Sequence, residues 1–225
     1  MRFTLIRHGQ YEQISQAPSA LQPYPLTNEG VDTVHKEAEA FRHWVKHNAI
    51  TLNPEVHCSS LLRAWQTANI FIDVLSDLFP AEPQLIESYN LCERSVGAVA
   101  NLTVTEIERL LELDPRFEKP PAGWKSDSFY QLPFDGAESL IESGERAKKH
   151  IENQCSKNPE ALTLFVGHGA AFRHAAYHLN VIKLCDIKKL SMHYGHPVAF
   201  ELTKEGDVLE LFGAWKTRTI QDAID

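Results

Sequence analysis

Short apolar runs alternate along the chain with longer stretches in which apolar residues recur every three or four positions. The short runs predict buried strands at residues 2–7, 56–59, 85–86 and 162–166. The longer stretches predict helices over residues 28–47, 60–78, 103–113 and 138–154, and a further helix after Gly169. Strands that alternate with helices predict an α/β fold of three layers, α/β/α, with a mostly parallel central sheet covered on both faces.

Two segments interrupt this alternation. Residues 198–202 and 208–212 are apolar runs on either side of a polar turn, and they predict a C-terminal hairpin at the edge of the sheet. Residues 114–134 carry four prolines and five aromatic residues, which indicates an ordered surface loop or a lid. The chain has no internal repeat, and its length allows one large domain or two small ones. We expect a single domain over residues 1–225 with this aromatic and proline-rich loop inserted.

The composition of the chain indicates a globular protein and argues against some classes of partner. Apolar residues make up 43% and charged residues 23% of the chain, as is typical of globular domains. The net charge of −8 without a basic block argues against a nucleic acid partner, and no run of about 18 apolar residues predicts a membrane span. The four cysteines form no CxxC pair, so we expect reduced thiols in a cytoplasmic protein, with Cys58 buried in its strand.

Polar motifs follow three of the predicted strands directly. Arg7-His8-Gly9 follows the first strand, Ser59-Ser60 ends the second, and Gly167-His168-Gly169 follows the strand at 162–166. In open α/β sheets ligands bind beyond the carboxyl ends of the strands, so we expect these three ends to form one site. Arginine offers a planar fork of donors to an anion, and glycine lets the backbone approach it closely.

Cleavage of a phosphate ester needs cations for the phosphoryl oxygens, an in-line nucleophile and a proton for the leaving oxygen. Arg7, and Arg63 at the start of the second helix, are placed to bind the oxygens from two directions. His8 is suited to attack phosphorus if its ring is neutral and its other nitrogen donates to a backbone carbonyl.

Further groups complete this candidate site. His168 can donate to the phosphoryl group, with the backbone amides of Gly169 and Ala170 behind it. Glu93 can protonate the leaving oxygen and later accept a proton from water, which predicts an acid pH optimum. Arg94 is a candidate for a supporting cation or for a structural role.

Six short blocks carry these residues in a fixed order: Arg7-His8-Gly9-Gln10, 26–30, 59–68, Glu93-Arg94, 136–139 and 166–169. With these blocks the chain resembles the histidine phosphatase superfamily, and in particular its phosphoglycerate-mutase-like group, over residues 2 to about 175. The resemblance implies a phosphohistidine intermediate on His8, phosphate binding by Arg7, Arg63 and His168, and an acid/base carboxylate at Glu93. It implies neither a metal nor another cofactor.

The segment after His8 departs from the mutase branch of this family, which carries a small hydroxyl residue three positions past the histidine and an asparagine six past it. Tyr11 and Ile14 occupy those positions, and a proline-rich loop at 18–25 replaces the loop that grips phosphoglycerate. We therefore expect a metal-independent phosphatase that acts on a small-molecule phosphate ester. Residues 93–97 and 136–139 keep the mutase outline, so a phosphoglycerate mutase stays open, as do a phosphoprotein substrate and an inactive module that binds phosphorylated ligands.

Other residues leave alternatives open. The two loops at 18–25 and 115–134 are expected to form walls of the substrate pocket. Trp124, Phe129 and Tyr130 indicate either a partly apolar substrate or simple packing beneath the loop. His174 and His178 stand four apart, the spacing of a metal pair, but no carboxylate or cysteine lies near them in the sequence, so we expect core or surface histidines. The sequence does not predict an oligomeric state.

Overall fold

The computed structural model describes residues 1–218, and residues 219–225 of the expected domain lie outside the described part. The helices are α1 (Asn28–His47), α2 (Leu62–Leu75), α3 (Val104–Leu113), α4 (Leu140–Cys155) and α5 (Gly169–His178). The strands are β1 (Arg2–Arg7), β2 (Glu55–Ser59), β3 (Gln84–Ser88), β4 (Leu162–Gly167), β5 (Leu190–Ser191), β6 (Pro197–Leu202), β7 (Val208–Phe212) and β8 (Lys216–Thr217). Within residues 1–218, no helix combines the length and the apolar character needed to cross a membrane.

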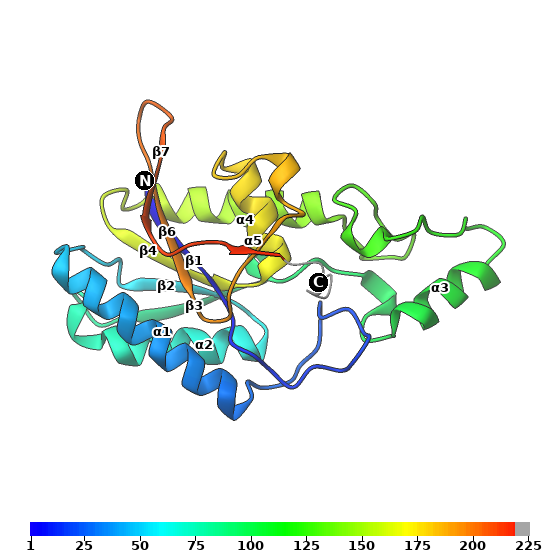
Figure 1. Cartoon of the computed structure of the whole chain (residues 1–225), viewed down its shortest axis with the longest axis horizontal. Coiled ribbons are helices and arrows are strands. Elements are labelled where there is room, and N and C mark those ends of the chain that lie inside the picture. Colours follow the sequence, from blue (N-terminus) through cyan, green and yellow to red (C-terminus); the bar gives the residue numbers. More distant parts are fainter. Residues whose placement is uncertain (219–225) are drawn as a thin grey trace.

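Six of the strands form one sheet in the order β3-β2-β4-β1-β6-β7. Strands β1 to β4 pair in parallel with their neighbours, whereas β6 pairs antiparallel with both β1 and β7. The hairpin formed by β6 and β7 therefore lies at one edge of the sheet, where Figure 1 shows it extending beyond the other strands. The predicted mostly parallel sheet and its C-terminal edge hairpin are both confirmed.

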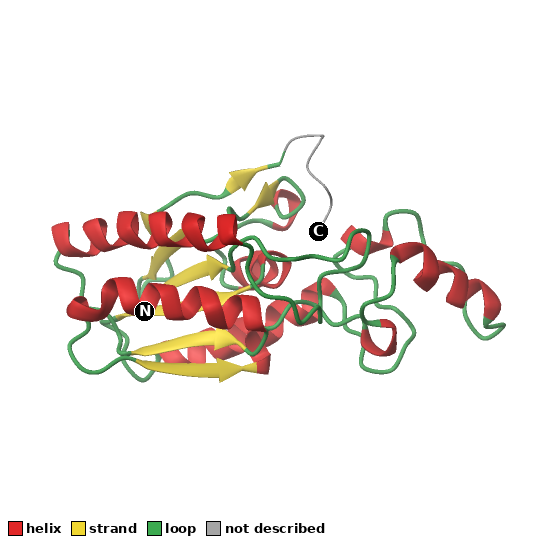
Figure 2. Ribbon diagram, turned by 90° about the horizontal axis from the view of Figure 1, so that it is seen from below, coloured by secondary structure: helices red, strands yellow, loops and turns green. Residues whose placement is uncertain are grey.

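Helices cover both faces of this sheet, with α1 and α2 on one side and α4 and α5 on the other (Figures 1 and 2). The alternation of side chains along each strand explains the arrangement. In β1, Ile6 packs with α1 and α2, whereas Phe3 and Leu5 pack with α4 and α5. In β4, Leu164 and Phe165 divide in the same way. Strands buried on both faces are apolar throughout, and the three-layer α/β/α fold is confirmed.

Side-chain caps mark the starts of three of the helices. The Thr27 hydroxyl accepts a hydrogen bond from the Gly30 amide at the start of α1, while Thr103 and Ser139 form capping boxes before α3 and α4. A Cβ at position 30 would lie 2.1 Å from the Gln10 carbonyl oxygen. Only glycine therefore allows the first turn of α1 to pack against the segment that follows β1.

A region around α3 projects from the three-layer body, as Figures 1 and 2 show. We call residues 96–134 the α3 region. It packs around a small core formed by Val99, Ile107, Leu111, Trp124 and Leu132, together with Ala20 of the proline-rich loop. The predicted loop at 114–134 packs against α3 within this core, and it contains one short 3-10 helix, Trp124–Ser126.

The small antiparallel sheet of β5 and β8 was not predicted. Each of its strands has only two residues, so neither carries a periodic pattern that a sequence could reveal. The sheet pairs β8 with β5, which lies between α5 and β6. The segment after β5 supplies contacts to Arg7 that are described below.

Candidate active site

The three predicted strand ends lie close together because β4 is hydrogen-bonded to both β1 and β2. Arg7 is the register partner of Gly167, and the His8 amide donates to the Gly167 carbonyl at 2.9 Å. The ring centroids of His8 and His168 are consequently 5.0 Å apart. The structure thus brings the motifs at the three strand ends together, as the sequence predicted.

His8 is held in one tautomer. Its side chain is 3% exposed, and Nδ1 lies 2.7 Å from the Gly9 carbonyl oxygen, while Nε2 accepts a hydrogen bond from Arg63 Nε at 3.2 Å. Because Nε2 is an acceptor, Nδ1 carries the proton and donates to Gly9. Burial, followed by the charges of Arg63 and Arg7, holds the pKa of His8 well below its usual value. The ring is therefore neutral near pH 7 with its lone pair on Nε2.

Arg63 lies in the first turn of α2 and is completely buried. Its Nη1 donates to the Gln22 carbonyl at 2.7 Å and its Nη2 donates to the Ser19 carbonyl at 2.8 Å. The guanidinium also lies over the Tyr11 ring, 4.4 Å from its centroid. The proline-rich loop thus fixes the far side of the guanidinium and leaves Nε directed at His8.

Arg7 occupies the end of β1, beside the start of α5. Its Nη1 donates to the Met192 carbonyl at 3.0 Å, and its guanidinium lies 4.2 Å from the centroid of the Tyr194 ring. A Cβ at position 169 would lie 3.3 Å from Cδ and Nε of Arg7, so Gly169 leaves room for this side chain. The two arginines therefore flank His8 from different elements, β1 and α2.

His168 is completely buried and lies between Arg63 and Ser59. Its Nδ1 is 3.2 Å from Nη2 of Arg63, and its Nε2 is 2.8 Å from the Ser59 hydroxyl oxygen. Burial and the nearby charges of Arg63 and Arg7 hold the pKa of His168 well below its usual value. In the structure as it stands, this ring is neutral.

Glu93 is held by the backbone amide of Arg94 and by two amides at the start of α5. Its Oε1 accepts from the amides of Arg94 and Ala171, each at 2.9 Å, and its Oε2 accepts from the Ala170 amide at 3.1 Å. The sequence placed the Ala170 amide behind the phosphoryl group, but in this structure that amide orients Glu93.

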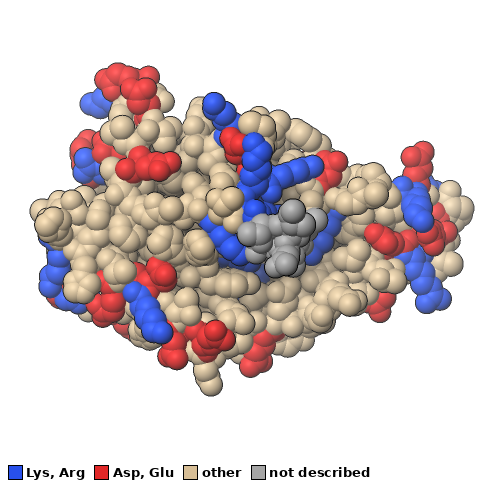
Figure 3. Space-filling view, viewed as in Figure 1, with Lys and Arg blue, Asp and Glu red and all other residues tan. Residues whose placement is uncertain are grey.

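A cavity of about 350 Å³ lies in front of Arg7, His8 and Glu93. The residues that line it are Arg7, His8, Tyr11, Gln13, Gln16, Ala17, Ser19, Glu93, Lys125 and Tyr194. Ser19, Glu93 and Lys125 also line a smaller neighbouring pocket, which adds Arg94. In Figure 3, Lys and Arg side chains gather near the middle of one face, while Asp and Glu lie mostly toward its periphery. A protein with a net charge of −8 therefore has a positive centre on this face.

Both expected loops contribute to the cavity walls, although the aromatic residues do not. Trp124 is 2% exposed, and its indole nitrogen donates to Glu108 at 3.0 Å within the core of the α3 region. Phe129 is 64% exposed on the surface. Of the two open interpretations, packing is correct for Trp124, and Lys125 is the residue that the α3 region contributes to the cavity.

Lys125 and Tyr194 were not predicted as site residues. Lys125 follows Trp124 in an irregular loop, where no periodicity shows which side chains turn inward. Tyr194 is fixed by the neighbouring Gly195 amide, which donates to the Arg7 carbonyl at 2.9 Å. Such long-range contacts leave no local signal in the sequence.

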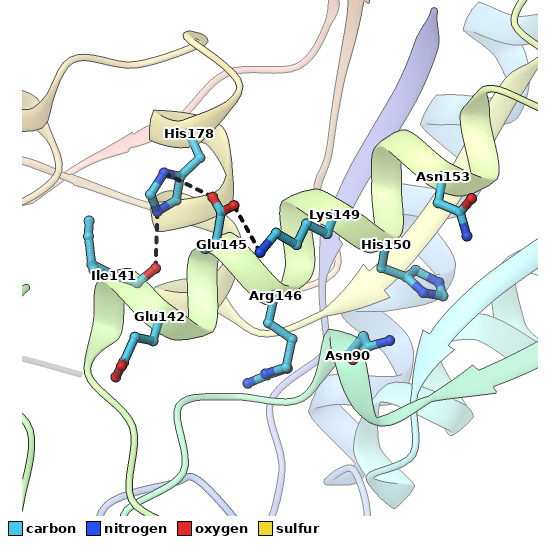
Figure 4. Close-up of a pocket in the computed structure, with 9 residues that line it drawn as sticks. All are labelled: Asn90, Ile141, Glu142, Glu145, Arg146, Lys149, His150, Asn153 and His178. Carbon is cyan, nitrogen blue, oxygen red and sulfur yellow. Dashed lines mark hydrogen bonds and ion pairs between the residues drawn. The ribbon is translucent and has the colours of Figure 1, made fainter.

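A second and larger hollow, of about 790 Å³, lies along α4 and is lined by residues such as Asn90, Arg146, His150 and His178. Figure 4 shows Glu145 joining His178 and Lys149 across this surface. It shares no lining residue with the cavity at His8. The strand ends, and not this larger hollow, bring a neutral histidine, two arginines and a carboxylate together.

His174 and His178, the two histidines four apart on α5, do not share a partner. His174 contacts the Ala170 carbonyl and the Ser128 hydroxyl, whereas His178 contacts the Ile141 carbonyl and Glu145. Each ring therefore has its own structural partners, in agreement with core or surface histidines. Within residues 1–218 no cluster of three metal-ligating side chains occurs.

Comparison with known proteins places these residues in a family context. The family model described as histidine phosphatase superfamily (branch 1) matches residues 3–214. The chain is 25% identical over 210 residues to a 2,3-bisphosphoglycerate-dependent phosphoglycerate mutase of Parvibaculum lavamentivorans, covering 91% of this chain and 92% of that one. It is 27% identical to the enzyme of the same name from Corynebacterium diphtheriae, covering 95% and 91% of the two chains.

Solved structures of similar fold carry other names. A mycobacterial glucosyl-3-phosphoglycerate phosphatase aligns with a TM-score of 0.67 and 17% identity over 88% of this chain and 89% of that one. The α-ribazole phosphatase of Shigella flexneri aligns with a TM-score of 0.66 and 18% identity over 96% and 95% of the two chains. At these identities the likeness establishes the shared fold.

Proposed function

Because the chain belongs to the histidine phosphatase superfamily, we propose that it hydrolyses phosphate monoesters through a phosphohistidine intermediate on His8. The observation that carries this proposal is the tautomer of His8, which holds a lone pair on Nε2 beside Arg63, in the same cavity as Glu93. Arg7 and Lys125 on the cavity wall, and the buried Arg63 that contacts His8 Nε2, supply the positive charge that a phosphoryl group requires, so no metal is invoked.

In the first step, Nε2 of His8 attacks phosphorus while the bond from phosphorus to the ester oxygen breaks. The protonated carboxyl of Glu93 gives its proton to the departing oxygen. The Nε–H of Arg63, which faces His8 Nε2 in the structure, donates to a phosphoryl oxygen once Nε2 is bonded to phosphorus, and Arg7 binds the oxygens from the opposite side. The proton on Nδ1 of His8 stays on that nitrogen and is donated in a hydrogen bond to the Gly9 carbonyl throughout this step.

In the second step, water attacks the phosphorus of phospho-His8. The phosphorus–nitrogen bond breaks and returns its electron pair to Nε2, while Glu93 accepts the proton that the water loses. The three amides that hold Glu93 fix the distance of its carboxyl from the site for both steps. A small-molecule ester fits the size of the cavity, and a phosphorylated side chain of a protein is the alternative substrate.

A phosphoglycerate mutase is the second candidate, favoured by the names of the curated relatives, which match over 91–95% of this chain. A mutase must retain the phosphoryl group and exclude water until it is returned to the substrate. Tyr11 lines the cavity at a position where the mutase branch has a small hydroxyl residue. This difference supports hydrolysis rather than phosphoglycerate mutase activity.

Phosphate release from a panel of phosphomonoesters, measured with a chelator present, tests the proposal. The panel includes 3-phosphoglycerate with and without a bisphosphate primer. Chelator-resistant release is the expected result. Primer-dependent isomerisation that outpaces release would instead establish the mutase, and tight binding of esters without either reaction would establish a binding module.

A further inference from the structure

A chain of hydrogen bonds leads from His168 away from the cavity. Nε2 of His168 is 2.8 Å from the Ser59 hydroxyl oxygen, and that hydroxyl donates to the sulfur of Cys92 at 3.2 Å. All three side chains are buried, so solvent does not compete for these bonds. Cys92 lies directly before Glu93, yet neither the family motifs nor the proposed mechanism gives its thiol a role.

The direction of this chain follows from the single hydrogen of the Ser59 hydroxyl. Because that hydrogen points to Cys92, the Ser59 oxygen acts as an acceptor toward its other neighbours, including the Leu61 amide at 3.3 Å. Nε2 of His168 therefore carries a proton and donates it to Ser59. The opposite nitrogen, Nδ1, is left as the acceptor for Nη2 of Arg63 at 3.2 Å.

In this tautomer the nitrogen that would face a bound anion, Nδ1, carries no proton and cannot donate to it. Nδ1 is on the side of Arg63, where the proposed function puts the phosphoryl oxygens, and a bare nitrogen lone pair repels an oxygen. The charged and titratable groups around His168 are Arg63 on α2, Arg7 and His8 from the end of β1, and Arg146 on α4, and the three arginines disfavour a protonated ring. A dianion placed among these cations offsets their effect and favours the imidazolium.

We propose that Ser59 and Cys92 are positioning residues that keep one proton on Nε2 of His168, so that binding of a dianion takes up a second proton from solvent at Nδ1. The imidazolium then donates from both nitrogens, to Ser59 on one side and to the anion on the other. This inference rests on the phosphate site of the proposed function, but it does not depend on turnover.

Calorimetry of sulfate binding tests the proposal directly, because sulfate is a dianion near neutral pH and brings no proton of its own. Binding enthalpies are measured at pH 7.5 in buffers with contrasting enthalpies of ionisation. The wild-type protein is expected to take up about one proton for each sulfate bound. The ¹⁵N chemical shifts of His168 are expected to change from the Nε2–H tautomer to the imidazolium on addition of sulfate.

Two substitutions of Cys92 separate positioning from packing. In Cys92→Ala the Ser59 hydroxyl loses its acceptor and is free to donate to Nε2, so His168 becomes a mixture of tautomers and proton uptake falls below half the wild-type value. Cys92→Ser retains an acceptor and is expected to restore the uptake. Cys155→Ala is the matched control, because it removes another buried thiol from a core away from the cavity and should leave proton uptake unchanged.

Sulfate binding without proton uptake in the wild-type protein would overturn the inference. It would also be overturned if Cys92→Ala retained both the uptake and the Nε2–H tautomer. A wild-type protein that binds no sulfate would contradict the phosphate site itself. If the protein takes up a proton on binding sulfate but hydrolyses no ester, the proposed hydrolase activity is wrong. The inference on Ser59 and Cys92 is then still supported.

Discussion

The strand-end site and the α3 region are built in opposite ways. The strand-end site is formed by Arg7, His8, Arg63, Glu93 and His168. All but the half-buried Arg7 are buried, and backbone carbonyls and amides hold Arg7, His8, Arg63 and Glu93 in place. The α3 region stands outside the sheet, packs around a small core that it shares with Ala20 of the proline-rich loop, and contributes Lys125 to the shared cavity. The reacting groups are therefore fixed by the sheet, whereas the wall that faces the rest of a substrate is carried by a separately packed region.

This difference suggests a division of roles. A phosphoryl group has the same shape in every monoester. The residues that bind it can therefore occupy rigid positions at strand ends. The remainder of the substrate varies, and a region with its own core can change without disturbing the sheet. We expect substitutions at the strand ends to affect all substrates alike, and substitutions in the α3 region to affect some substrates more than others.

The largest effect is expected for Glu93→Gln, which keeps the shape of the side chain but cannot transfer a proton. We expect kcat to fall by about 10³-fold, within the range of general acid–base catalysis. Esters with good leaving groups, which need little protonation, should lose less in the first step. Equal losses of less than tenfold for all esters would remove Glu93 from the acid/base role.

Arg63→Lys is expected to lower kcat/KM by about 10²-fold, because a lysine cannot hold His8, Gln22 and Ser19 at once with a planar fork. The loss should be similar for every ester in the panel. Arg116→Lys serves as the matched control, since Arg116 is exposed in the α3 region and pairs with Asp114. A substrate-dependent loss for Arg63→Lys would break the proposed division.

Lys125→Gln is expected to lower kcat/KM by about tenfold for esters that carry a second anionic group, and by less for the others. The reason is the position of Lys125 on the cavity wall contributed by the α3 region. Steady-state kinetics on charged and uncharged esters of the same leaving group provide the comparison. A uniform loss across that panel would place Lys125 with the phosphoryl-binding groups instead.

His57→Phe should have the smallest effect, and it should act on stability rather than activity. His57 is buried in β2, neither ring nitrogen forms a hydrogen bond within the described residues, and burial lowers its pKa to about 4. The unfolded chain therefore binds more protons than the folded protein between about pH 4 and 6.5, so folding stability falls as pH falls through that window.

Phenylalanine at position 57 removes this penalty and keeps the ring stacked on Phe165. We expect the gain in the free energy of unfolding to be larger at pH 5 than at pH 8 by about 2 kcal/mol. Denaturant unfolding at the two pH values measures the difference. A stability gain that is equal at both would show that protonation of His57 is not its cause.

Local patterns in the sequence predicted the strand-end site better than they predicted the contribution of the α3 region. Strand ends carry their signals locally, because Arg7-His8-Gly9 and Gly167-His168-Gly169 each follow an apolar run that a parallel sheet must bury. Helix starts such as Ser139 with Glu142 are equally local. The layers, the edge hairpin and the convergence of the candidate site residues could therefore be predicted from local patterns in the sequence.

Contacts between distant segments could not be predicted in this way. Lys125 enters the cavity only because Trp124, its neighbour, is anchored in the core of the α3 region. The direction of the bonds from His168 through Ser59 to Cys92 depends on three elements meeting in space. The Ala170 amide reaches Glu93 for the same reason, although the sequence directed it to the phosphoryl group.

The central claim is the covalent phosphohistidine on His8. Rapid quenching of the enzyme with an ester substrate, followed by mass spectrometry under alkaline conditions that preserve phosphohistidine, tests it most directly. We predict phosphate on His8 of the wild-type protein, and neither phosphorylation nor turnover in a folded His8→Ala variant. Turnover that persists in His8→Ala, or phosphate found on another residue, would contradict the account.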